Sequence, residues 1–473
     1  MSVISEQIKQ EFIQIVGVQN YEDSSASKLV YSFDATPGFQ AMPDAVISPR
    51  NKDEVARVVK VCHVHSIPIV PRGAGTNLSA GTTPLAGGIV LLFKHLDQII
   101  ELDEANLTVT VQPGVNTLEL IQFVEERGLF YPPDPSSMKI SQIGGNISEN
   151  SGGLRGLKYG VTRDYVLGLE VVLANGEVIR TGGKLAKDVA GYDLTSLMVG
   201  SEGTLGIVTE AILKLIPKPE TIQTALALFD SMDAAARAVS KIIAERVIPA
   251  TLEFLDRPTL QVVEDNSQIG LPTDVEAVLL IEQDGVADQV QQDMEKIVRI
   301  CEEAGAQSVR LAQSAVEAEQ LRTARRSALS ALARLKPTTI LEDATVPRSE
   351  IATMVKKINE IALHYRIKIC TFGHAGDGNL HPTCLTDARD KDEMERVEQA
   401  LEDIFTAAIE LGGTITGEHG VGAMKAPYLH LKLGEEGIAA MKAIKTGLDP
   451  KNILNPNKIF AKSNRKRVVV GVE

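Results

Sequence analysis

Apolar residues recur at the spacing of an α-helix in several parts of the chain. Residues 5–16 place Ile8, Phe12 and Ile15 on one face, and Ser5 stands where an N-cap is expected. The same spacing predicts further helices over residues 51–66, 117–127, 232–245, 286–304, 314–334, 349–364, 391–411 and 435–446.

Short apolar runs predict buried strands between these helices. They cover residues 67–70, 89–93, 97–101, 107–112, 165–174, 224–229, 250–255, 277–283, 338–346 and 368–374. After residues 217–219 (Pro-Lys-Pro), strands and amphipathic helices alternate over short loops, which indicates a second α+β unit with helices against a sheet.

Glycines gather in clusters that are far apart in the sequence. They lie within residues 72–77, 144–153 and 200–206, and the last two belong to a stretch rich in Gly, Pro, Asn and Ser. Backbone without a Cβ can approach a ligand closely. Several such segments favour one extended ligand, such as a dinucleotide, over a small metabolite.

The first glycine cluster does not fit the Rossmann fingerprint. It follows a strand, but Leu78 stands where the third glycine of G-x-G-x-x-G is required. Successive backbone N–H groups in a tight turn still form a concavity for an anion. The loop therefore predicts phosphate binding without NAD, and a plain surface turn is the alternative.

Two histidines flank another tight turn. The segment from His374 to His381 lies between two strand-like runs, so a hairpin would turn both imidazoles toward each other. Glu418 and His419 follow 37 residues later. Two histidines and one carboxylate are a catalytic type of divalent metal site, and His419 is placed to act as a base. The alternative is a hydrogen-bonded polar pair.

The predicted helix over residues 314–334 carries arginines that invite two interpretations. One guanidinium can grip a substrate carboxylate with two hydrogen bonds. The alternative is a solvated basic face. The arginines are Arg322, Arg325, Arg326 and Arg334.

Composition narrows the class of protein. The 473 residues are 44% hydrophobic and 23% charged, which is typical of a globular protein, and the net charge of −14 argues against nucleic acid and anionic membranes. The four cysteines form no C-x-x-C motif, so neither an iron–sulfur cluster nor a disulfide framework is indicated. We see no signal peptide or apolar span and expect a cytoplasmic protein, with a solvated basic tail from Lys462 to Arg467.

Several motifs in combination resemble one family. They are PRGAGTNLSAG, QIGGNISENSGGLRGLKYG, GYDLTSLMVGSEGTLGIVTE, GHAGDGNLH, GEHGVG and LDPKNILNPNK. The chain resembles the FAD-linked oxidases of the vanillyl-alcohol oxidase and p-cresol methylhydroxylase fold, from about residue 40 to the C-terminus. Within them it looks like the 2-hydroxy-acid branch, which includes the glycolate oxidase flavin subunit and D-lactate dehydrogenases.

This resemblance implies an α+β architecture with a two-part FAD domain around an inserted cap. The FAD-binding domain would span residues 1–217, the substrate and metal cap 218–425, and a C-terminal segment 426–473 would return to the FAD domain. The implied FAD contacts are Arg72, Gly73, Ala74, Gly75, Thr76, Asn77, Ser137, Gly145, Asn146, Ser151, Gly153, Tyr159, Glu202, Gly206, Val208 and Asn455. The first glycine loop lacks the histidine that tethers FAD in some relatives, which predicts noncovalent binding.

The resemblance also assigns catalytic roles. His374, His381 and Glu418 would hold a divalent metal (Zn, Mn or Fe), His419 would be the base, and Arg325 would bind the substrate carboxylate. The 2-hydroxyglutarate enzymes carry a threonine and a lysine where this chain has Leu329 and Leu341. A small monocarboxylate, such as D-lactate or glycolate, therefore fits better than a dicarboxylate.

The expected reaction is oxidation of a D-2-hydroxy acid to the 2-oxo acid by hydride transfer to flavin N5. The alternatives are a D-2-hydroxyglutarate dehydrogenase and the flavin subunit of a multi-subunit glycolate oxidase. The electron acceptor would be a quinone, an iron–sulfur subunit or an electron-transfer protein. A homo-oligomer or a subunit of a complex is expected, with membrane association only through partners. A flavin ether-lipid synthase or alcohol oxidase of the same fold is the closest rival.

Overall fold

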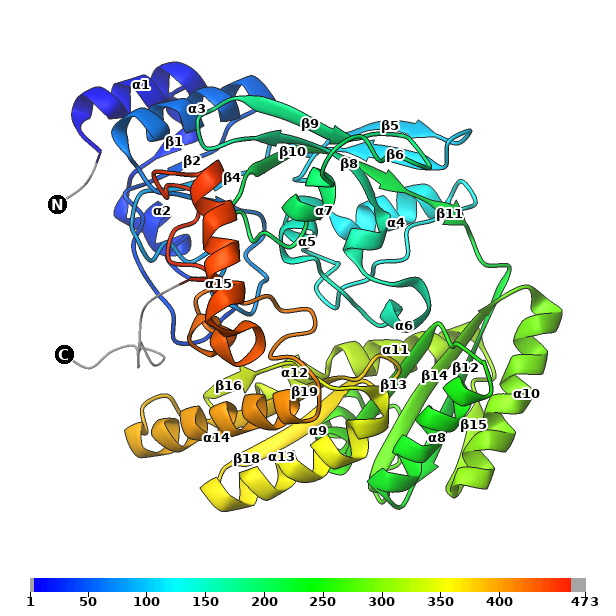
Figure 1. Cartoon of the computed structure of the whole chain (residues 1–473). Coiled ribbons are helices and arrows are strands. Elements are labelled where there is room, and N and C mark those ends of the chain that lie inside the picture. The colour runs from blue at the N-terminus through cyan, green and yellow to red at the C-terminus, as the bar shows by residue number, and fades with distance from the viewer. Residues whose placement is uncertain (1–3, 461–473) are drawn as a thin grey trace. The chain divides into compact units, whose positions relative to one another are not determined.

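The computed structural model describes residues 4–460, which form two compact units (Figure 1). Among these residues, unit 1 comprises residues 4–151, Val161–Lys218 and residues 418–460. Unit 2 comprises Gly152–Gly160 and Pro219–Gly417. The basic run Lys462 to Arg467 lies outside the described residues. The predicted domain limits at residues 217 and 425 stay a prediction.

Unit 1 begins with a small sheet whose strand order is β1-β2-β4-β3. β2, β4 and β3 are parallel. The strands are β1 (Tyr21–Glu22), β2 (Ala45–Ile47), β3 (Ile69–Arg72) and β4 (Ile89–Leu92). The helices are α1 (Glu6–Val16), α2 (Ser25–Val30) and α3 (Lys52–His65), with a 3-10 turn η1 (Val18–Asn20). Buried faces of α1 and α3 pack into one apolar core with these strands.

The second sheet of unit 1 has the order β5-β6-β10-β8-β9, and every pair is antiparallel. Its strands are β5 (Ile99–Asp103), β6 (Thr108–Val111), β8 (Val166–Val172), β9 (Val178–Gly182) and β10 (Ile207–Lys214). A short pair joins β7 (Leu129–Phe130) and β11 (Ile216–Pro217). The apolar pattern did not predict β9 or β10, because β9 is a mostly exposed edge strand and β10 directly follows a glycine-rich segment.

The helix predicted over residues 117–127 is α4 (Thr117–Glu125). The glycine-rich stretch that follows contains short helices that periodicity did not predict, namely α5 (Ile143–Glu149), the 3-10 turn η2 (Thr162–Tyr165) and α7 (Leu194–Met198). Helices of five to seven residues are too short to show a helical repeat. α5 ends at Asn150 in the left-handed conformation, which shapes the following loop.

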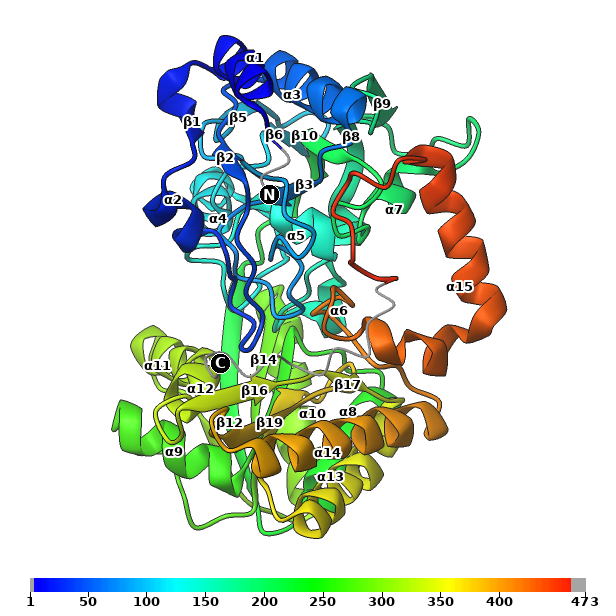
Figure 2. The same cartoon turned by 90° about the vertical axis from the view of Figure 1, so that its left-hand side faces the viewer.

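The C-terminal part of unit 1 contains η4 (Ala426–Tyr428) and the long helix α15 (Leu429–Leu448), which is interrupted at Gly434. Only Leu429 and Lys445 of α15 are buried, and Figure 2 shows the helix standing away from the sheets of unit 1. Lys445 donates hydrogen bonds to Asp449 and to the carbonyl oxygens of Thr204 and Leu454.

Unit 2 is built on a sheet of order β15-β12-β14-β13-β18-β19-β16, with β17 beside β19, all antiparallel. The strands are β12 (Thr221–Phe229), β13 (Thr251–Asp256), β14 (Ala277–Gly285), β15 (Ala306–Leu311), β16 (Thr338–Leu341), β17 (Ala344–Thr345), β18 (Lys368–His374) and β19 (Asn379–Thr386).

The helices of unit 2 pack on this sheet and on one another. α8 contacts α10 and α13, and α13 contacts α14, while α9 packs against α11 and α12 (Figure 1). Their bounds are α6 (Gly156–Tyr159), α8 (Met232–Ala244), α9 (Arg257–Ser267), α10 (Ala287–Ala304), α11 (Ala315–Arg326), α12 (Ala328–Leu332), η3 (Arg348–Glu350), α13 (Ile351–Tyr365) and α14 (Lys391–Glu410).

One predicted helix is two helices in the structure. The segment 314–334 breaks between α11 and α12 at Ser327, whose hydroxyl donates to the carbonyl oxygen of Ala324. A serine that bonds to a backbone carbonyl competes with the helical hydrogen-bond pattern. The break ends α11 just after Arg326.

The register of the unit 2 sheet places polar side chains on one face. Thr251 pairs with Glu282, so Glu253 and Glu282 share a face. Leu255 pairs with Phe372, which puts His374 on that face as well. His381 joins them because it pairs with Phe372. Largely apolar neighbouring strands therefore place ionisable side chains next to one another on the same face of the sheet.

Among residues 4–460, no helix combines the length and apolar character needed to cross a membrane.

Candidate active site

Two buried histidines face each other in the β18–β19 hairpin. His374 lies opposite Asn379 in the ladder, and the rings of His374 and His381 are 5.1 Å apart at an angle of 86°. The turn needs glycine at position 378, where φ is +85° and a Cβ would overlap the carbonyl oxygen of Val346. The hairpin expected from the sequence is present, and it brings the two imidazoles together.

A carboxylate completes a group of metal-ligand type. One ligand atom from each of His374, His381 and Glu418 lies within 4.8 Å of the others. Glu418 follows Gly417, whose N–H donates to Asp343 Oδ2 at 2.7 Å and so anchors the chain just before the carboxylate. Two imidazoles and one carboxylate suit Zn, Mn or Fe, so these residues fit a divalent ion.

A buried glutamate that the analysis of the sequence missed lies beside the histidines. Glu253 on β13 is completely buried. Its Oε1 lies 2.6 Å from His374 Nδ1, and its Oε2 lies 2.5 Å from Arg325 Nη2. A single acidic residue inside the apolar run ATLEFL was the signal that could have identified it, since a buried carboxylate requires partners.

The charges around Glu253 keep its carboxylate ionised. Burial by itself opposes ionisation, but the positive charges of Arg325 and His374, together with the hydrogen bond from His374, hold the pKa of Glu253 below its ordinary value. The direction of the shift agrees with the short contacts.

Of the four predicted arginines, Arg325 is the one that is buried and that contacts Glu253 beside the histidines. Its guanidinium lies 4.8 Å from the centre of the Phe372 ring, and only 3% of its side chain is exposed. Its Nε is a buried donor that has no hydrogen-bond partner among the described residues. Arg322 is instead paired with Glu282 at 2.6 Å, and Arg334 is exposed. Arg325 therefore retains a donor for a ligand anion.

His419, the predicted base, is half-buried and directly follows Glu418. The loop after it, which is part of unit 1, is held by Glu202, because the N–H groups of Val421 and Gly422 donate to this carboxylate at 2.7 and 2.6 Å. Glu202 was expected to contact FAD, and in the structure its carboxylate holds this loop.

The first glycine loop is shaped by the buried arginine at its start. Arg72 donates to the carbonyl oxygen of Phe33 at 2.7 Å and stacks on the Tyr31 ring. Burial lowers the pKa of Arg72, and Asp34 opposes this. Gly75 has φ +71°, and a Cβ there would overlap the guanidinium. The left-handed backbone at position 75 therefore favours glycine, and any larger residue would also displace the guanidinium of Arg72.

Two predicted FAD contacts brace the loops through side-chain amides. Asn77 accepts from the N–H of Gly81 at 2.8 Å and donates to Thr82 at 3.0 Å. Asn455 donates to the carbonyl oxygens of Gly81 and Glu202 at 2.9 and 2.7 Å. These amides connect three segments that are distant in sequence.

The remaining predicted cofactor residues of unit 1 differ in their surroundings. A Cβ at Gly145 would meet open space, whereas one at Gly206 would overlap Val171. Asn146 is buried and donates to Thr117 at 2.8 Å. Glycine at 206 is therefore explained by packing, and Gly145 leaves room for a ligand. The others in unit 1 are Gly73, Ala74, Thr76, Ser137, Ser151 and Val208.

Two predicted cofactor residues lie in unit 2. Gly153 and Tyr159 belong to the segment Gly152–Gly160. The Tyr159 hydroxyl donates to the carboxylate of Asp284 at 2.9 Å, and Lys158 Nζ lies 2.5 Å from the same carboxylate. Their role in binding FAD stays a prediction.

Unit 1 also buries charged groups that the analysis of the sequence did not identify. Burial and the neighbouring Glu202 raise the pKa of Glu149 well above its ordinary value. Burial lowers the pKa of Lys458 to about 8, against the effect of the nearby carboxylates, and its Nζ donates to the carbonyl oxygen of Thr83. Lys458 thereby holds the C-terminal segment to the loop that contains Thr83.

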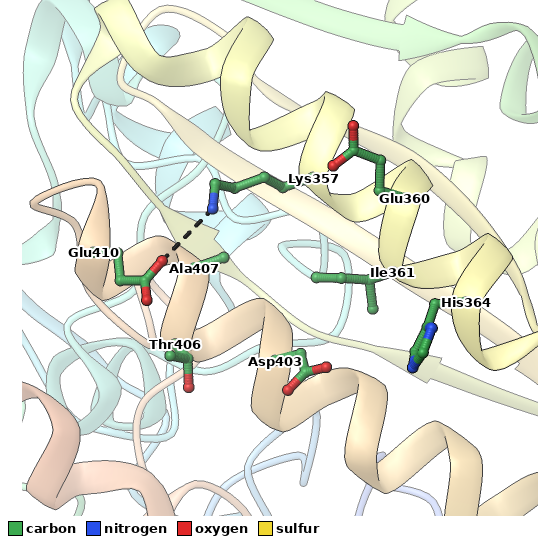
Figure 3. A pocket seen from close by; sticks show the side chains of 8 residues that line it. All are labelled: Lys357, Glu360, Ile361, His364, Asp403, Thr406, Ala407 and Glu410. Atoms are coloured by element: carbon green, nitrogen blue, oxygen red, sulfur yellow. Dashed lines mark ion pairs between the residues drawn. The ribbon is translucent and has the colours of Figure 1, made fainter.

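A hollow of about 370 Å³ lies elsewhere in unit 2, between α13 and α14 (Figure 3). Lys357 and Glu410 approach each other across it at 3.6 Å. None of the residues predicted for cofactor, metal or substrate lines this hollow.

Comparison with known families decides the classification. Residues 218–459 match the family described as FAD linked oxidases, C-terminal domain, and residues 43–182 match the family described as FAD binding domain. The chain belongs to the FAD-linked oxidases. FAD is therefore its cofactor, and the chain is an FAD-dependent oxidoreductase, as the motifs had indicated.

Individual relatives of this FAD-linked oxidase cover almost the whole chain. The glycolate oxidase subunit GlcD of Bacillus subtilis is 71% identical over 467 residues, which is 99% of each chain. The protein of the same name from Escherichia coli is 39% identical and covers 90% of this chain and 86% of its own. A D-lactate dehydrogenase of Archaeoglobus fulgidus is 36% identical, covering 91% and 96%.

Solved structures confirm the fold of this FAD-linked oxidase. p-Cresol methylhydroxylase with substrate bound has a TM-score of 0.80 at 18% identity and covers 96% of both chains. 4-Ethylphenol oxidase from Gulosibacter chungangensis has a TM-score of 0.78 at 20% identity, covering 96% of this chain and 98% of its own. The predicted α+β fold of the p-cresol methylhydroxylase type is confirmed.

Proposed function

We propose that this FAD-linked oxidase converts a small D-2-hydroxy acid, of the glycolate or D-lactate type, into the 2-oxo acid. The observation that carries the proposal is Glu253, which connects a buried arginine to a histidine of the metal-ligand group. A 2-hydroxy acid offers a carboxylate to the buried arginine and a hydroxyl oxygen to the metal-ligand group. The names of these relatives, two glycolate oxidase subunits and a D-lactate dehydrogenase, support this substrate class.

The substrate carboxylate would bind Arg325. Its charge and its unpartnered Nε suit a carboxylate oxygen, and Phe372 stacks on the guanidinium and limits its movement. This contact places the α-carbon relative to the histidines, which is the positioning part of catalysis.

His419 would take the hydroxyl proton on its imidazole. The C–H bond at the α-carbon breaks with its electron pair leaving as hydride, and the C–O bond becomes a carbonyl. Bound FAD supplies the acceptor for that hydride. A general base of this kind contributes about 100- to 10,000-fold to the rate.

His374, His381 and Glu418 would hold a divalent ion beside the base. Zn, Mn and Fe all suit this donor set, and the ion would supply Lewis acidity toward the substrate oxygens. The carboxylate of Glu253 at His374 Nδ1 would fix that ring so that Nε2 faces the ion.

FAD would be held without a covalent bond. Residues 72–77 contain no histidine, and Gly145 leaves open space for a ligand. Acid precipitation of the protein is expected to leave the yellow colour in the supernatant. Colour that stays in the pellet contradicts noncovalent binding.

A monocarboxylate remains preferred over 2-hydroxyglutarate, because Leu329 and Leu341 offer no charge to a second carboxylate. Electrons would leave the flavin to a partner, since the cysteines Cys62, Cys301, Cys370 and Cys384 are buried and dispersed. The partner would be an iron–sulfur subunit, a quinone or an electron-transfer protein.

A role as one subunit of a complex is the second candidate, favoured by the word subunit in the names of the GlcD relatives. A cytoplasmic location, with membrane association only through partner subunits, and a homo-oligomer stay predictions. Turnover of the isolated chain with an artificial dye separates an autonomous dehydrogenase from a subunit that needs its partners.

Anaerobic flavin bleaching tests the proposal directly. D-Lactate or glycolate should bleach the visible flavin band rapidly, and EDTA should abolish the effect. L-Lactate, D-2-hydroxyglutarate and p-cresol serve as comparison compounds. If p-cresol bleaches the flavin and no hydroxy acid does, an alcohol oxidase function replaces the proposal.

A further inference from the structure

Glu253 contacts two groups that the proposed reaction uses separately. One carboxylate oxygen faces His374 Nδ1 at 2.6 Å, and the other faces Arg325 Nη2 at 2.5 Å. The side chain of Glu253 is completely buried, and those of His374 and Arg325 are 6% and 3% exposed. The three side chains therefore form one buried group, held together by the two contacts of the carboxylate.

This arrangement gives the glutamate a function beyond charge compensation. A metal-ligating histidine commonly donates its second ring N–H to a carboxylate, which fixes the tautomer and makes the ligating nitrogen more basic. The other oxygen of the same carboxylate is ion-paired with the guanidinium of Arg325. A displacement of one partner is therefore expected to disturb the other.

We propose that Glu253 is a positioning residue that orients His374 for the metal ion and Arg325 for the substrate carboxylate. The inference rests on the proposed function for the identity of the two ligands. Glu253 need not touch either ligand, because its effect acts through His374 and Arg325.

The same sheet offers a matched control. Glu282 lies on the same face of the sheet, is nearly as buried, and pairs with Arg322 of the same helix at 2.6 Å. The hydroxyl of Thr224 also donates a hydrogen bond to the carboxylate of Glu282, at 2.8 Å. E282Q therefore removes a buried acid–arginine pair while leaving the contact between His374 and the carboxylate of Glu253 intact.

The test measures Mn²⁺ binding to FAD-loaded protein without substrate, by the loss of the free Mn²⁺ signal in electron paramagnetic resonance. E253Q should weaken Mn²⁺ binding by about 10- to 100-fold, the usual cost of removing such a partner of a metal ligand. E282Q should bind Mn²⁺ as the wild type does. Flavin content and circular dichroism verify that both variants are folded.

A second readout separates positioning from a general loss of structure. With saturating Mn²⁺, E253Q should show a raised KM for the hydroxy acid through the released Arg325, whereas E282Q should not. If E253Q does not fold, E253D replaces it, with E282D as control. Aspartate keeps the charge but is too short to reach both partners, so Mn²⁺ binding should again weaken.

Three results overturn the inference: Mn²⁺ affinity unchanged in E253Q, an equal loss in E282Q, or no Mn²⁺ binding by the wild type. The proposed function fails separately, if the wild type binds Mn²⁺ through Glu253-dependent contacts but no hydroxy acid bleaches its flavin. EDTA-sensitive bleaching with unchanged Mn²⁺ affinity in E253Q leaves the function standing and removes Glu253 from it.

Discussion

The Nη2 atom of Arg325 lies 2.5 Å from Oε2 of Glu253, and neither side chain is more than 3% exposed. A buried ion pair of this kind is costly to break, because the remaining charge has no water to solvate it. The pair thus links the stability of unit 2 to the chemistry that we propose for it.

Removing the arginine should therefore destabilise the protein as well as weaken substrate binding. R325A leaves Glu253 buried with less compensation, and we expect a loss of about 3–5 kcal/mol in the free energy of unfolding, measured with urea. R325K should recover part of the stability but not KM, since lysine lacks the planar fork. R334A, at an exposed arginine near the end of the same predicted helix, is the control. Equal stability of R325A and R334A would contradict the prediction.

Replacing the proposed base should affect turnover and spare cofactor binding. H419N should reduce kcat by at least about 100-fold, because no other group is expected to take the hydroxyl proton. Flavin content and Mn²⁺ affinity should stay at the wild-type level. H430A changes an exposed histidine on α15 and should leave kcat unchanged. Near-normal turnover of H419N would remove His419 from the role of base.

The turn of the histidine hairpin should tolerate no side chain. In G378A the residue keeps a positive φ and its Cβ overlaps the carbonyl oxygen of Val346, so the hairpin must shift. G270A is the matched control, since Gly270 has φ +79° and open space around its Cβ. Both should lose about 1–2 kcal/mol from the left-handed conformation. Only G378A should lose further stability, and it should also lose Mn²⁺ affinity. Equal melting temperatures of G378A and G270A would be evidence against a constrained turn.

Asp256 predicts a specific pH dependence. Burial raises the pKa of Asp256 to about 6, although Thr259 and Thr371 donate hydrogen bonds to it. The folded state therefore holds a proton that the unfolded state releases near pH 4, so this contribution to stability is present below pH 4 and lost as pH rises through 6.

D256N removes this titration. Between pH 4 and pH 7 the wild type should therefore lose about 2–3 kcal/mol more of its free energy of unfolding than D256N does. Asparagine cannot accept both backbone hydrogen bonds, so D256N should be less stable than the wild type at low pH. The test therefore compares how the free energy of unfolding, measured with urea, changes with pH in each protein. D390N alters an exposed N-cap of α14 and serves as control. Parallel pH profiles for the wild type and D256N would refute the assignment.

Periodicity predicted the long helices well, because their amphipathic faces reflect packing that is local to the element. α1 begins after the predicted cap Ser5, whose hydroxyl accepts from the N–H of Ile8. α3 begins after Asn51, at the start of the predicted segment 51–66, and the Asn51 side chain accepts from the N–H of Glu54. The break at Ser327 was not predicted, because a serine hydroxyl bonds either to solvent or to the backbone depending on its surroundings.

The sequence by itself determined the family, the cofactor and the hairpin that joins His374 to His381, since glycine turns and ligand spacing act over short stretches of chain. It named Arg325 but not the partner of that arginine. Only the tertiary structure decided this, because β13 and β18 must pair before Glu253 can reach His374. Such a contact joins residues 121 positions apart, and no local pattern carries that information.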